Sequence, residues 1–535
     1  MKIIITERIA QEGIDYLINE GYDVDLKFGI SHDDLLEIID QYDAIIVRSV
    51  TKVNKEVIEK GVNLKVAGRA GNGIDNIDVE ECTKHGIIAV NTPESNVMAA
   101  AELAVGMAFC VFRNIVQADK AGRKGDFRRN LFVGKELDEK VAGIIGFGRI
   151  GKIVASKLVG CNMKVICYDP YVTEETFEQY NVKKCDSLEE LIKASDLISL
   201  HTPKTVETKG LIGEKELAMC KKGVRIVNAA RGGLVDEKAL YNALKSGQVS
   251  AAALDVLDPE PGYDKTPEDQ DYTNPLLELD NIIITPHLGA STMEATYNVG
   301  TAVTKLVDGA LQGELVPAVN LPTIKKKDVK AVKPFVELAE MMGKIYYQTE
   351  KEQIKSIEIK YRGELAEKET KLISLSVAKG FLSTIVKENV NYVNTELILE
   401  SMGIDLVESK SSHIEKYTNM VTVSFVTISD KKFNISGTVF AKDQIRLIDF
   451  YGYHLDFDPT KYIVAIQNED VPGIIGKIGT AFGNFGVNIG AMQWSRNQTK
   501  DRAISFVSVD IDVSEDLVEE IRGLEGVLKV SKINL

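Results

Sequence analysis

Three polar side chains in the middle of the chain have the types that oxidation of a 2-hydroxy acid needs. Each follows a run of small and β-branched residues: Arg231 follows VRIVNAA, Glu260 follows AALDVLDP and His287 follows NIIITP. Histidine suits proton transfer because its ordinary pKa lies near neutral pH, and a neighbouring carboxylate stabilises the imidazolium. Arginine holds a substrate carboxylate through two parallel hydrogen bonds. The combination predicts a site for hydride and proton removal, although each residue alone is more typical of a strand cap or a core position.

A glycine-rich turn upstream of these residues has the pattern that binds the pyrophosphate of a dinucleotide. Gly146, Gly148 and Gly151 belong to GFGRIG, which follows the apolar run VAGII and precedes the helical pattern KIVASKLV. Glycines at these positions permit a tight turn and bring backbone N–H groups close to a pyrophosphate at the helix N-terminus. The next apolar run, KVICY, ends at Asp169, which is spaced to accept a hydrogen bond from a ribose 2′-hydroxyl and would repel a 2′-phosphate. We therefore expect NAD rather than NADP as the cofactor.

The tripeptide His201-Thr202-Pro203 ends another apolar run, LISL. In an α/β sheet the carboxyl ends of the strands are where cofactors bind, so this turn is a candidate cofactor contact. A loop that only caps the edge of the sheet explains it as well, and both interpretations stay open.

The apolar runs that must position these residues are short and alternate with helical patterns. KIIIT, AIIVRS, LKVAGR and IIAVN occupy the first hundred residues, and VAGII, KVICY, LISL, VRIVN, AAAL and NIIIT follow later. Near-continuous apolar strands separated by helices are typical of parallel sheets covered on both faces. The sequence therefore predicts an α/β fold with two doubly wound, Rossmann-like parallel-sheet units joined by an apolar helix over about 99–114. A helix over about 293–309 is expected to cross back to the first unit.

The linker VPAVNLPTIKKK, with Lys325, Lys326 and Lys327 in solvent, introduces a second half of different composition. Its first part contains amphipathic runs such as IKSIEIKY and NMVTVSFVTIS, which predict an α+β domain without a chemical motif. From YIVAIQ onward the pattern reads strand, helix, strand, strand, helix, strand, which is the ferredoxin-like βαββαβ unit. We expect four domains: 1–97 with 286–316, 98–285, 317–455 and 456–535.

The bulk composition limits the classes of function. A chain of 535 residues with a formal net charge of -15 lacks the basic excess that nucleic acids and anionic membranes attract. The first residues, MKIIITER, have no signal-peptide pattern, and the longest apolar stretch contains Glu102 and is too short for a membrane span. The 6 cysteines form no CxxC pair, so we expect reduced thiols and no metal site. These features predict a soluble cytoplasmic enzyme.

The motifs NAARGGLVDEKAL, ALDVLDPEP, TPHLGAST and GFGRIGKIVASKL resemble those of the D-isomer-specific 2-hydroxyacid dehydrogenases, over about residues 1–316. The resemblance implies that Arg231 orients the substrate, that Glu260 supports the histidine and that His287 transfers the proton. It also implies the following cofactor positions: Asn72, Arg149, Ile150, Asp169, Thr202, Ala229, Asp255 and Gly289.

Within that family, the stretches VRSVTKV, GRAGNGIDNID and NTPESNVMAAAELAVGMAF resemble the long-form branch that oxidises 3-phospho-D-glycerate to 3-phosphohydroxypyruvate, the first step of L-serine biosynthesis. The branch carries an intervening domain and a C-terminal ACT domain, and it implies a homodimer or a homotetramer. A phosphorylated substrate needs two or three cations. The resemblance offers Arg48, Arg69 and Arg129 for this role, with Arg128 beside the last of them.

The turns NEDVPG and FGVNI resemble the effector turns of ACT domains. The resemblance implies that Asp470 and Asn488 bind an amino acid such as L-serine. The chain has Asn468 where some relatives carry histidine, so inhibition by L-serine stays open.

Two other functions remain open on the sequence. The chemistry of the three polar residues would equally serve a reductase of glyoxylate, hydroxypyruvate or 2-oxoglutarate. An amino-acid-sensing protein with an inert dehydrogenase half is the alternative from a different class, and an assay with NADH separates it from both enzymes.

Overall fold

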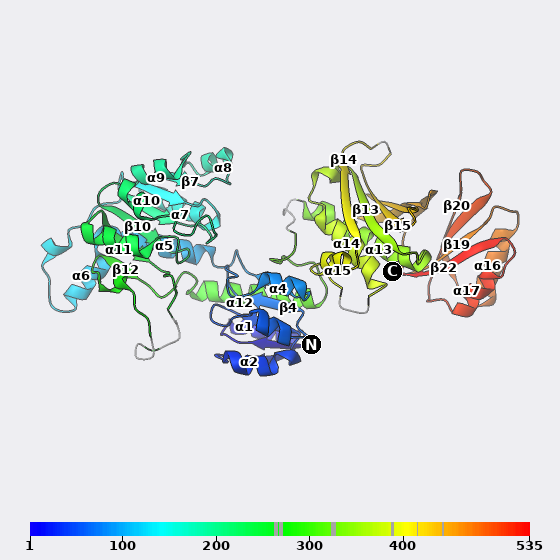
Figure 1. The fold of residues 1–535 in the computed structure, drawn as a ribbon, viewed down its shortest axis with the longest axis horizontal. Helices are drawn as coiled ribbons and strands as arrows, with labels where there is room; N and C mark the ends of the chain where they lie inside the picture. Colours follow the sequence, from blue (N-terminus) through cyan, green and yellow to red (C-terminus); the bar gives the residue numbers. More distant parts are fainter. Residues whose placement is uncertain (262–265, 267–270, 323–327, 387–389, 415, 441–442) are drawn as a thin grey trace.

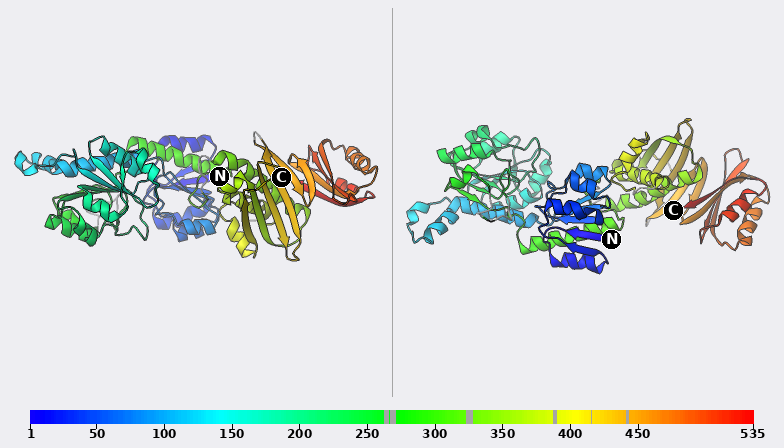
Figure 2. Two further views of the ribbon diagram at one scale, coloured as in Figure 1. Left: turned by 90° about the horizontal axis from the view of Figure 1, so that it is seen from above. Right: turned by 60° about the horizontal axis from the view of Figure 1, so that its bottom comes forward.

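Four sheets follow one another along the long axis of the molecule in the computed structural model (Figures 1 and 2). The structure describes residues 1–261, 266, 271–322, 328–386, 390–414, 416–440 and 443–535. The second sheet in chain order lies at one end of the molecule, the first sheet lies next to it, and the third and fourth continue toward the other end. The linker residues Lys325, Lys326 and Lys327 lie outside the described residues.

The first sheet is parallel and has the strand order β2-β1-β3-β4-β5. Its elements are β1 (Lys2–Ile5), α1 (Gln11–Asn19), β2 (Asp23–Leu26), α2 (His32–Ile38), η1 (Ile39–Gln41), β3 (Ala44–Val47), α3 (Lys55–Lys60), β4 (Val66–Arg69), α4 (Val79–Lys84) and β5 (Ile88–Asn91). β3 is buried along its whole length, as a near-continuous apolar run predicts. The expected strands omitted β2, because this edge strand alternates aspartates with apolar residues and stays partly exposed.

The second sheet is also parallel, with the order β12-β11-β10-β9-β6-β7-β8. Its strands are β6 (Val141–Ile145), β7 (Lys164–Tyr168), β8 (Lys183–Lys184), β9 (Leu197–Leu200), β10 (Val224–Asn228), β11 (Val249–Leu254) and β12 (Ile282–Ile284). The accompanying helices are α6 (Ile115–Gly122), η2 (Arg129–Phe132), α7 (Arg149–Val159), α8 (Glu174–Gln179), α9 (Leu188–Ala194), α10 (Glu214–Met219), α11 (Glu237–Ser246) and η4 (Pro275–Glu278). The strand order reverses between β6 and β9. In open α/β sheets, ligands bind at such a switch point, beyond the carboxyl ends of the strands.

Two long helices connect these sheets. α5 (Val97–Arg113) leaves the first sheet and packs on β10 and β11, while α12 (Met293–Leu311) returns and packs on α1 and β4. On β4 an added Cβ at Gly68 would lie 2.8 Å from Cγ2 of Val307, so glycine permits the close approach of α12. Asp308 of α12 accepts hydrogen bonds from the hydroxyls of Tyr16 (2.5 Å) and Tyr22 (2.7 Å). The first sheet is therefore covered in part by a helix that follows the second sheet in the chain, as the sequence predicts; the residue-level domain boundaries stay predictions.

The third sheet is mixed and has the order β14-β13-β15-β16-β17-β18. Its elements are α13 (Val329–Thr349), β13 (Ile354–Gly363), η5 (Glu364–Glu367), α14 (Lys371–Ser383), α15 (Thr395–Ser401), β14 (Asp405–Ser411), β15 (Asn419–Thr427), β16 (Lys432–Phe440), β17 (Gln444–Phe450) and β18 (Tyr453–Phe457). α13 and α14 pack closely because an added Cβ at Gly343 would lie 2.1 Å from the carbonyl oxygen of Val377. The predicted α+β unit is thus built around a helix pair.

The fourth sheet is antiparallel, with the order β20-β21-β19-β22. Its elements are β19 (Tyr462–Glu469), α16 (Ile474–Asn484), β20 (Ile489–Arg496), β21 (Arg502–Val509), α17 (Glu515–Arg522) and β22 (Val527–Asn534). This sequence of elements and this strand order confirm the predicted ferredoxin-like βαββαβ unit.

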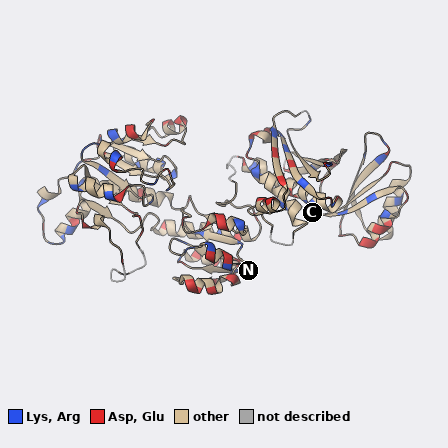
Figure 3. Cartoon of the chain, viewed as in Figure 1, with Lys and Arg blue, Asp and Glu red and all other residues tan. Residues whose placement is uncertain are grey.

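Charged residues of both signs are interspersed over all four units (Figure 3). Among the described residues, no single helix is long and apolar enough to cross a membrane; α5 and α6 reach that length and composition only as a pair, bent by 66°. All 6 cysteines are free.

Candidate active site

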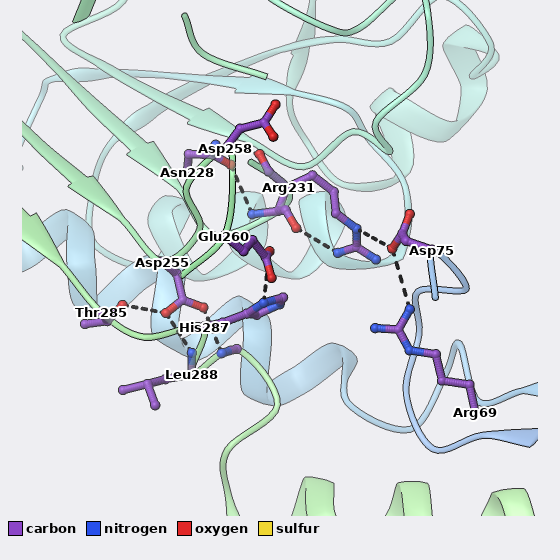
Figure 4. A network of polar contacts seen from close by, with 12 residues as sticks. Arg69, Asp75, Asn228, Arg231, Asp255, Asp258, Glu260, Thr285, His287 and Leu288 are labelled. Atoms are coloured by element: carbon purple, nitrogen blue, oxygen red, sulfur yellow. Dashed lines mark hydrogen bonds and ion pairs between the residues drawn. The ribbon is translucent and has the colours of Figure 1, made fainter. Parts of the chain in front are cut away.

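The three residues of the predicted site follow neighbouring strands of the second sheet. The chain turns to Arg231 after β10, to Glu260 after β11 and to His287 after β12. Because β10, β11 and β12 pair in parallel, their carboxyl ends meet at one edge of the sheet. Figure 4 shows the three side chains directed into the same space, which faces Arg69 and Asp75 of the first unit. The structure therefore brings together the side chains that the sequence predicts to act together.

His287 and Glu260 form an ion pair or hydrogen bond, depending on the protonation of the imidazole. Nδ1 of His287 lies 3.3 Å from Oε1 of Glu260, and both side chains are partly exposed (Figure 4). This contact leaves Nε2 on the opposite side of the ring. A carboxylate at this position stabilises the imidazolium and fixes the orientation of the ring.

The loop that carries His287 is held by Asp255. The buried Asp255 carboxylate accepts hydrogen bonds from the hydroxyl of Thr285 (2.5 Å) and from the backbone N–H groups of Leu288 (2.7 Å) and Gly289 (2.9 Å). Burial raises the pKa of Asp255, while the donated hydrogen bonds act in the opposite direction. Predicted as cofactor residues, Asp255 and Gly289 here bind each other and position the loop. Their contact with a cofactor stays a prediction.

A tight turn presents Arg231. Asn228, the last residue of β10, donates from Nδ2 to the carbonyl oxygen of Arg231 (2.9 Å) and accepts from the N–H of Ala230 (3.1 Å). After the arginine, an added Cβ at Gly232 would lie 2.1 Å from the carbonyl oxygen of Leu257. The turn therefore needs glycine at this position to pack against the loop that leads to Glu260. Ala229, a predicted cofactor residue, lies half-buried in the same turn.

A second arginine reaches the site from the first sheet. Arg69, the last residue of β4, is nearly buried, and burial lowers its pKa. Its NH1 lies 3.5 Å from Oδ2 of Asp75, and Nε of Arg231 lies 3.4 Å from the same oxygen (Figure 4). Asp75 was not among the sequence-predicted residues. It lies in the predicted motif RAGNGIDN, but its contact joins two sheets, and only the tertiary structure can show such a contact.

The other candidate substrate arginines differ in position. Arg48 follows β3 at the same edge as Arg69; its NH1 donates to the carbonyl oxygen of Arg8 (3.3 Å) and its backbone N–H donates to Glu7 (2.8 Å). Arg129 begins η2, beyond α6, and is exposed. Among the described residues the structure shows no contact between Arg129 and the site, and the neighbouring Arg128 pairs with Asp126 at 2.6 Å. Substrate contacts for Arg48, Arg69 and Arg129 remain predictions.

The glycine-rich turn has the geometry that a pyrophosphate site requires. Gly146 has φ +90°, an added Cβ at Gly151 would lie 2.1 Å from the carbonyl oxygen of Gly146, and an added Cβ at Gly148 would meet no protein atom within 4 Å. Gly148 precedes α7 and provides no side-chain cap, so the first N–H groups of the helix are available to an anion. The turn therefore fits the pyrophosphate of a dinucleotide.

Further predicted cofactor residues surround this turn. Asp169 accepts hydrogen bonds from the N–H groups of Phe147 (2.8 Å) and Tyr171 (2.9 Å), which ties the end of β7 to the turn. The hydroxyl of Thr202, after β9, is buried and has no hydrogen-bond partner among the described residues. The remaining predicted contacts are Arg149, whose NH2 lies 3.6 Å from Glu94, the half-buried Ile150, and Asn72, whose carbonyl oxygen accepts a hydrogen bond from Asn91 (2.6 Å).

The two predicted effector residues do not meet within one chain. Asp470 pairs with Arg496 (2.8 Å), and Asn488 donates to Asp510 (2.8 Å). They lie before and after α16, a helix of 11 residues, and are separated by its length of roughly 16 Å.

Comparisons with known proteins agree with this architecture. A family model described as the NAD-binding domain of D-isomer-specific 2-hydroxyacid dehydrogenases matches residues 105–289, the D-3-phosphoglycerate dehydrogenase intervening domain matches 331–451, and the ACT domain matches 462–526. Among solved structures, the apo form of D-lactate dehydrogenase from Escherichia coli covers 59% of this chain and 99% of its own, with a TM-score of 0.51 and 27% identity. D-mandelate dehydrogenase from Rhodotorula graminis covers 59% of this chain and 96% of its own, with a TM-score of 0.53 and 28% identity.

Curated relatives match along the whole chain. D-3-phosphoglycerate dehydrogenases from Methanocaldococcus jannaschii and Archaeoglobus fulgidus are 40% and 39% identical, and each match covers 100% of both chains. The enzyme of that name from Bacillus subtilis is 35% identical over 100% of this chain and 99% of its own. With this full-length similarity and the three domain matches in order, the chain belongs to the D-3-phosphoglycerate dehydrogenase family of D-isomer-specific 2-hydroxyacid dehydrogenases.

Proposed function

We propose that this protein transfers hydride between NAD and a 2-hydroxy acid, and that its substrate pair is 3-phospho-D-glycerate and 3-phosphohydroxypyruvate, at the first step of L-serine biosynthesis. The observation that carries the proposal is the contact between His287 and Glu260 at 3.3 Å, in a space that Arg231 and Arg69 enter from two different sheets. A proton acceptor beside paired cations suits an anionic hydroxy acid.

The roles follow from the chemistry of the side chains. In the oxidative direction Nε2 of His287 takes the proton of the substrate hydroxyl, and Glu260 stabilises the imidazolium that forms. Arg231 holds the substrate carboxylate and fixes the reacting carbon relative to His287. In the reverse direction the imidazolium returns the proton to the carbonyl oxygen. Bound NAD supplies the hydride acceptor.

The cofactor residues fit this role. The N-terminus of α7 and the glycines of the turn receive the pyrophosphate, and Asp169 lies at the end of β7, where a ribose hydroxyl is recognised. The buried hydroxyl of Thr202 provides a further donor beside Gly146. Arg48 and Arg69 supply the cations for the phosphate, and Arg129 is proposed to act on a neighbouring subunit, because it is exposed on its own chain.

The experiment that tests the function is an assay of NADH oxidation. The expected result is a kcat/KM at least about tenfold higher for 3-phosphohydroxypyruvate than for glyoxylate, hydroxypyruvate or 2-oxoglutarate, because a paired phosphate adds more than ~1.4 kcal/mol of binding. A preference for one of the other oxo acids would contradict the substrate, and no turnover of any would contradict the enzyme.

The variant His287→Ala tests the site. Turnover is expected to fall by roughly 10²- to 10⁴-fold, which is the usual contribution of a general acid–base group. NADH affinity, measured by fluorescence titration, should stay near that of the wild type because His287 lies outside the glycine-rich turn. Retained turnover would contradict the assignment.

We further propose that the C-terminal ACT domain binds an amino-acid effector and that the protein is a homodimer or a homotetramer. The separation of Asp470 from Asn488 along α16 supports an effector site that two copies of the domain complete together. Calorimetric titration with L-serine and sedimentation analysis test the two parts separately.

A further inference from the structure

Asp75 occupies the position between the two arginines of the site. Its Oδ2 lies 3.5 Å from NH1 of Arg69 and 3.4 Å from Nε of Arg231, although the two arginines belong to different sheets (Figure 4). The side chain of Asp75 is 66% exposed, whereas those of Arg69 and Arg231 are 11% and 26% exposed. A solvent-exposed carboxylate therefore pairs with two cations that are largely withdrawn from water.

The loop is shaped for this contact. An added Cβ at Gly73 would lie 2.5 Å from NH2 of Arg231, 2.7 Å from NH1 of Arg69 and 2.8 Å from Oδ2 of Asp75. Glycine at this position permits both guanidinium groups and the carboxylate to meet. The loop after β4 thus brings its own anion to the arginine pair.

Asp75 does not saturate the arginines. Its two contacts are longer than the 2.7–2.9 Å of charge-assisted hydrogen bonds. Nε and NH1 of Arg69 are buried and have no hydrogen-bond acceptor among the described residues. A nearly buried guanidinium with unfilled donors gains more from a substrate oxyanion at hydrogen-bond distance than from this loose ion pair.

We infer that Asp75 competes with the anionic substrate for the two arginines: it pairs with Arg69 and Arg231 in the free enzyme, and the substrate's carboxylate or phosphate displaces it when the substrate binds. The inference rests on the proposed function, since it takes the same arginines as substrate ligands. Asp75 is a positioning residue in this scheme, because it acts only through the arginines.

The test compares Asp75→Asn with a matched control, Glu80→Gln. Glu80 is an exposed acid on α4 that pairs with Lys84 at 2.9 Å, so the control removes the same charge from the same unit without touching the arginines. For Asp75→Asn the KM for 3-phosphohydroxypyruvate should fall roughly 3- to 10-fold, because the substrate no longer has to displace ion pairs whose free energy corresponds to about this factor in affinity. The kcat should stay within about twofold. Glu80→Gln and the charge-preserving Asp75→Glu should keep the wild-type KM.

Two results would overturn the inference. An unchanged KM in Asp75→Asn would show that the aspartate does not compete, and a fall in kcat with an unchanged or higher KM would make it a fixed support of Arg231.

Competition by inorganic phosphate gives a second readout, with an inhibition constant that should fall by the same factor. If the wild-type protein fails to reduce 3-phosphohydroxypyruvate, the proposed function fails by itself; calorimetric titration with phosphate then still decides whether Asp75→Asn binds an anion more tightly.

Discussion

At the scale of single residues, the backbone explains how the loop after β12 presents an imidazole. His287 has φ +54°, a left-handed conformation that few residues other than glycine adopt. Hydrogen bonds offset the free-energy cost of this backbone conformation. The N–H of His287 donates to the carbonyl oxygen of Asp255 (2.9 Å), and the carboxylate of Asp255 accepts from Thr285 and Leu288. The backbone that carries His287, the proposed proton acceptor, is therefore held by the buried Asp255.

A second histidine gives a residue-scale prediction for stability. Burial lowers the pKa of His201 from 6.5 to about 4, and its Nε2 lies 2.8 Å from the hydroxyl of Ser199. Between these pH values the unfolded chain binds a proton that the folded chain does not, so the free energy of unfolding falls as the pH falls. The contribution of the neutral His201 to the free energy of unfolding is complete above pH 6.5 and is lost by about pH 4. At ~1.4 kcal/mol per pKa unit it amounts to roughly 3–4 kcal/mol.

The measurement is calorimetric unfolding of the wild type and of His201→Gln between pH 7.5 and 4. The unfolding transition to follow is the one whose midpoint temperature NADH raises, because a ligand stabilises the unit that binds it. The stability difference between the two proteins should decrease on acidification, because the glutamine does not titrate. If the stability difference between the wild type and His201→Gln did not depend on pH, the folded protein would not be lowering the pKa of His201.

At this scale the sequence could predict the residues proposed to react, but not all of the residues that hold them in position. Arg231, Glu260 and His287 follow strands, and side chains after parallel strands must gather at one edge. Asp75 and the anchoring function of Asp255 escaped prediction for a physical reason. Their partners are a second sheet in one case and backbone N–H groups in the other, and neither appears in residue types or spacing.

At the scale of elements, the sequence pattern predicted the strands correctly where a strand is buried and its residues must therefore be apolar. The inner strands of both parallel sheets are mostly apolar and buried, which confirmed the α/β prediction. β2 and β8 were missed because edge strands have one unpaired side and tolerate Asp and Lys. The turn between β6 and α7 was predictable from its glycines together with the preceding strand, the following helix and Asp169, and its glycines meet different demands: a Cβ at Gly151 would meet a backbone oxygen, whereas a Cβ at Gly148 would meet no protein atom within 4 Å.

Those separate demands give a prediction at this scale. In Gly151→Ala the new methyl group would lie 2.1 Å from a backbone oxygen, so the NADH-shifted unfolding transition should lose about 1–3 kcal/mol or more. In Gly148→Ala the methyl group meets no protein atom within 4 Å, so stability should change by less than about 0.5 kcal/mol.

NADH titration completes this comparison. The Gly148→Ala methyl group would stand where the pyrophosphate approaches the backbone, and the Kd for NADH should rise about tenfold or more. Unchanged NADH affinity in a fully stable Gly148→Ala protein would place the pyrophosphate elsewhere.

At the scale of the whole molecule, the two C-terminal units share a core. The largest buried cluster joins α13, α14 and the third sheet to Ile463, Ile504 and Phe506 of the fourth sheet. The ring of Phe506 lies 4.9 Å from that of Phe450 and 5.3 Å from that of Phe457. The sequence predicted the two units from their separate strand patterns, but an alternating strand shows only that a face is buried and does not reveal which neighbour covers it.

This shared core predicts that residues 329–535 unfold as one cooperative unit, distinct from the NADH-shifted transition. Phe506→Ala should lower the C-terminal transition by about 3–5 kcal/mol, the usual cost of removing a buried phenylalanine, because the cavity opens between both sheets. NADH binding should not change, since Phe506 lies in β21 of the fourth sheet and the dinucleotide turn lies between β6 and α7 of the second. Calorimetry with and without NADH separates the two transitions. If Phe506→Ala melted the fourth sheet first and left the third intact, the two units would be merely adjacent, and an effector bound at the ACT domain would lack a rigid connection to the rest of the chain.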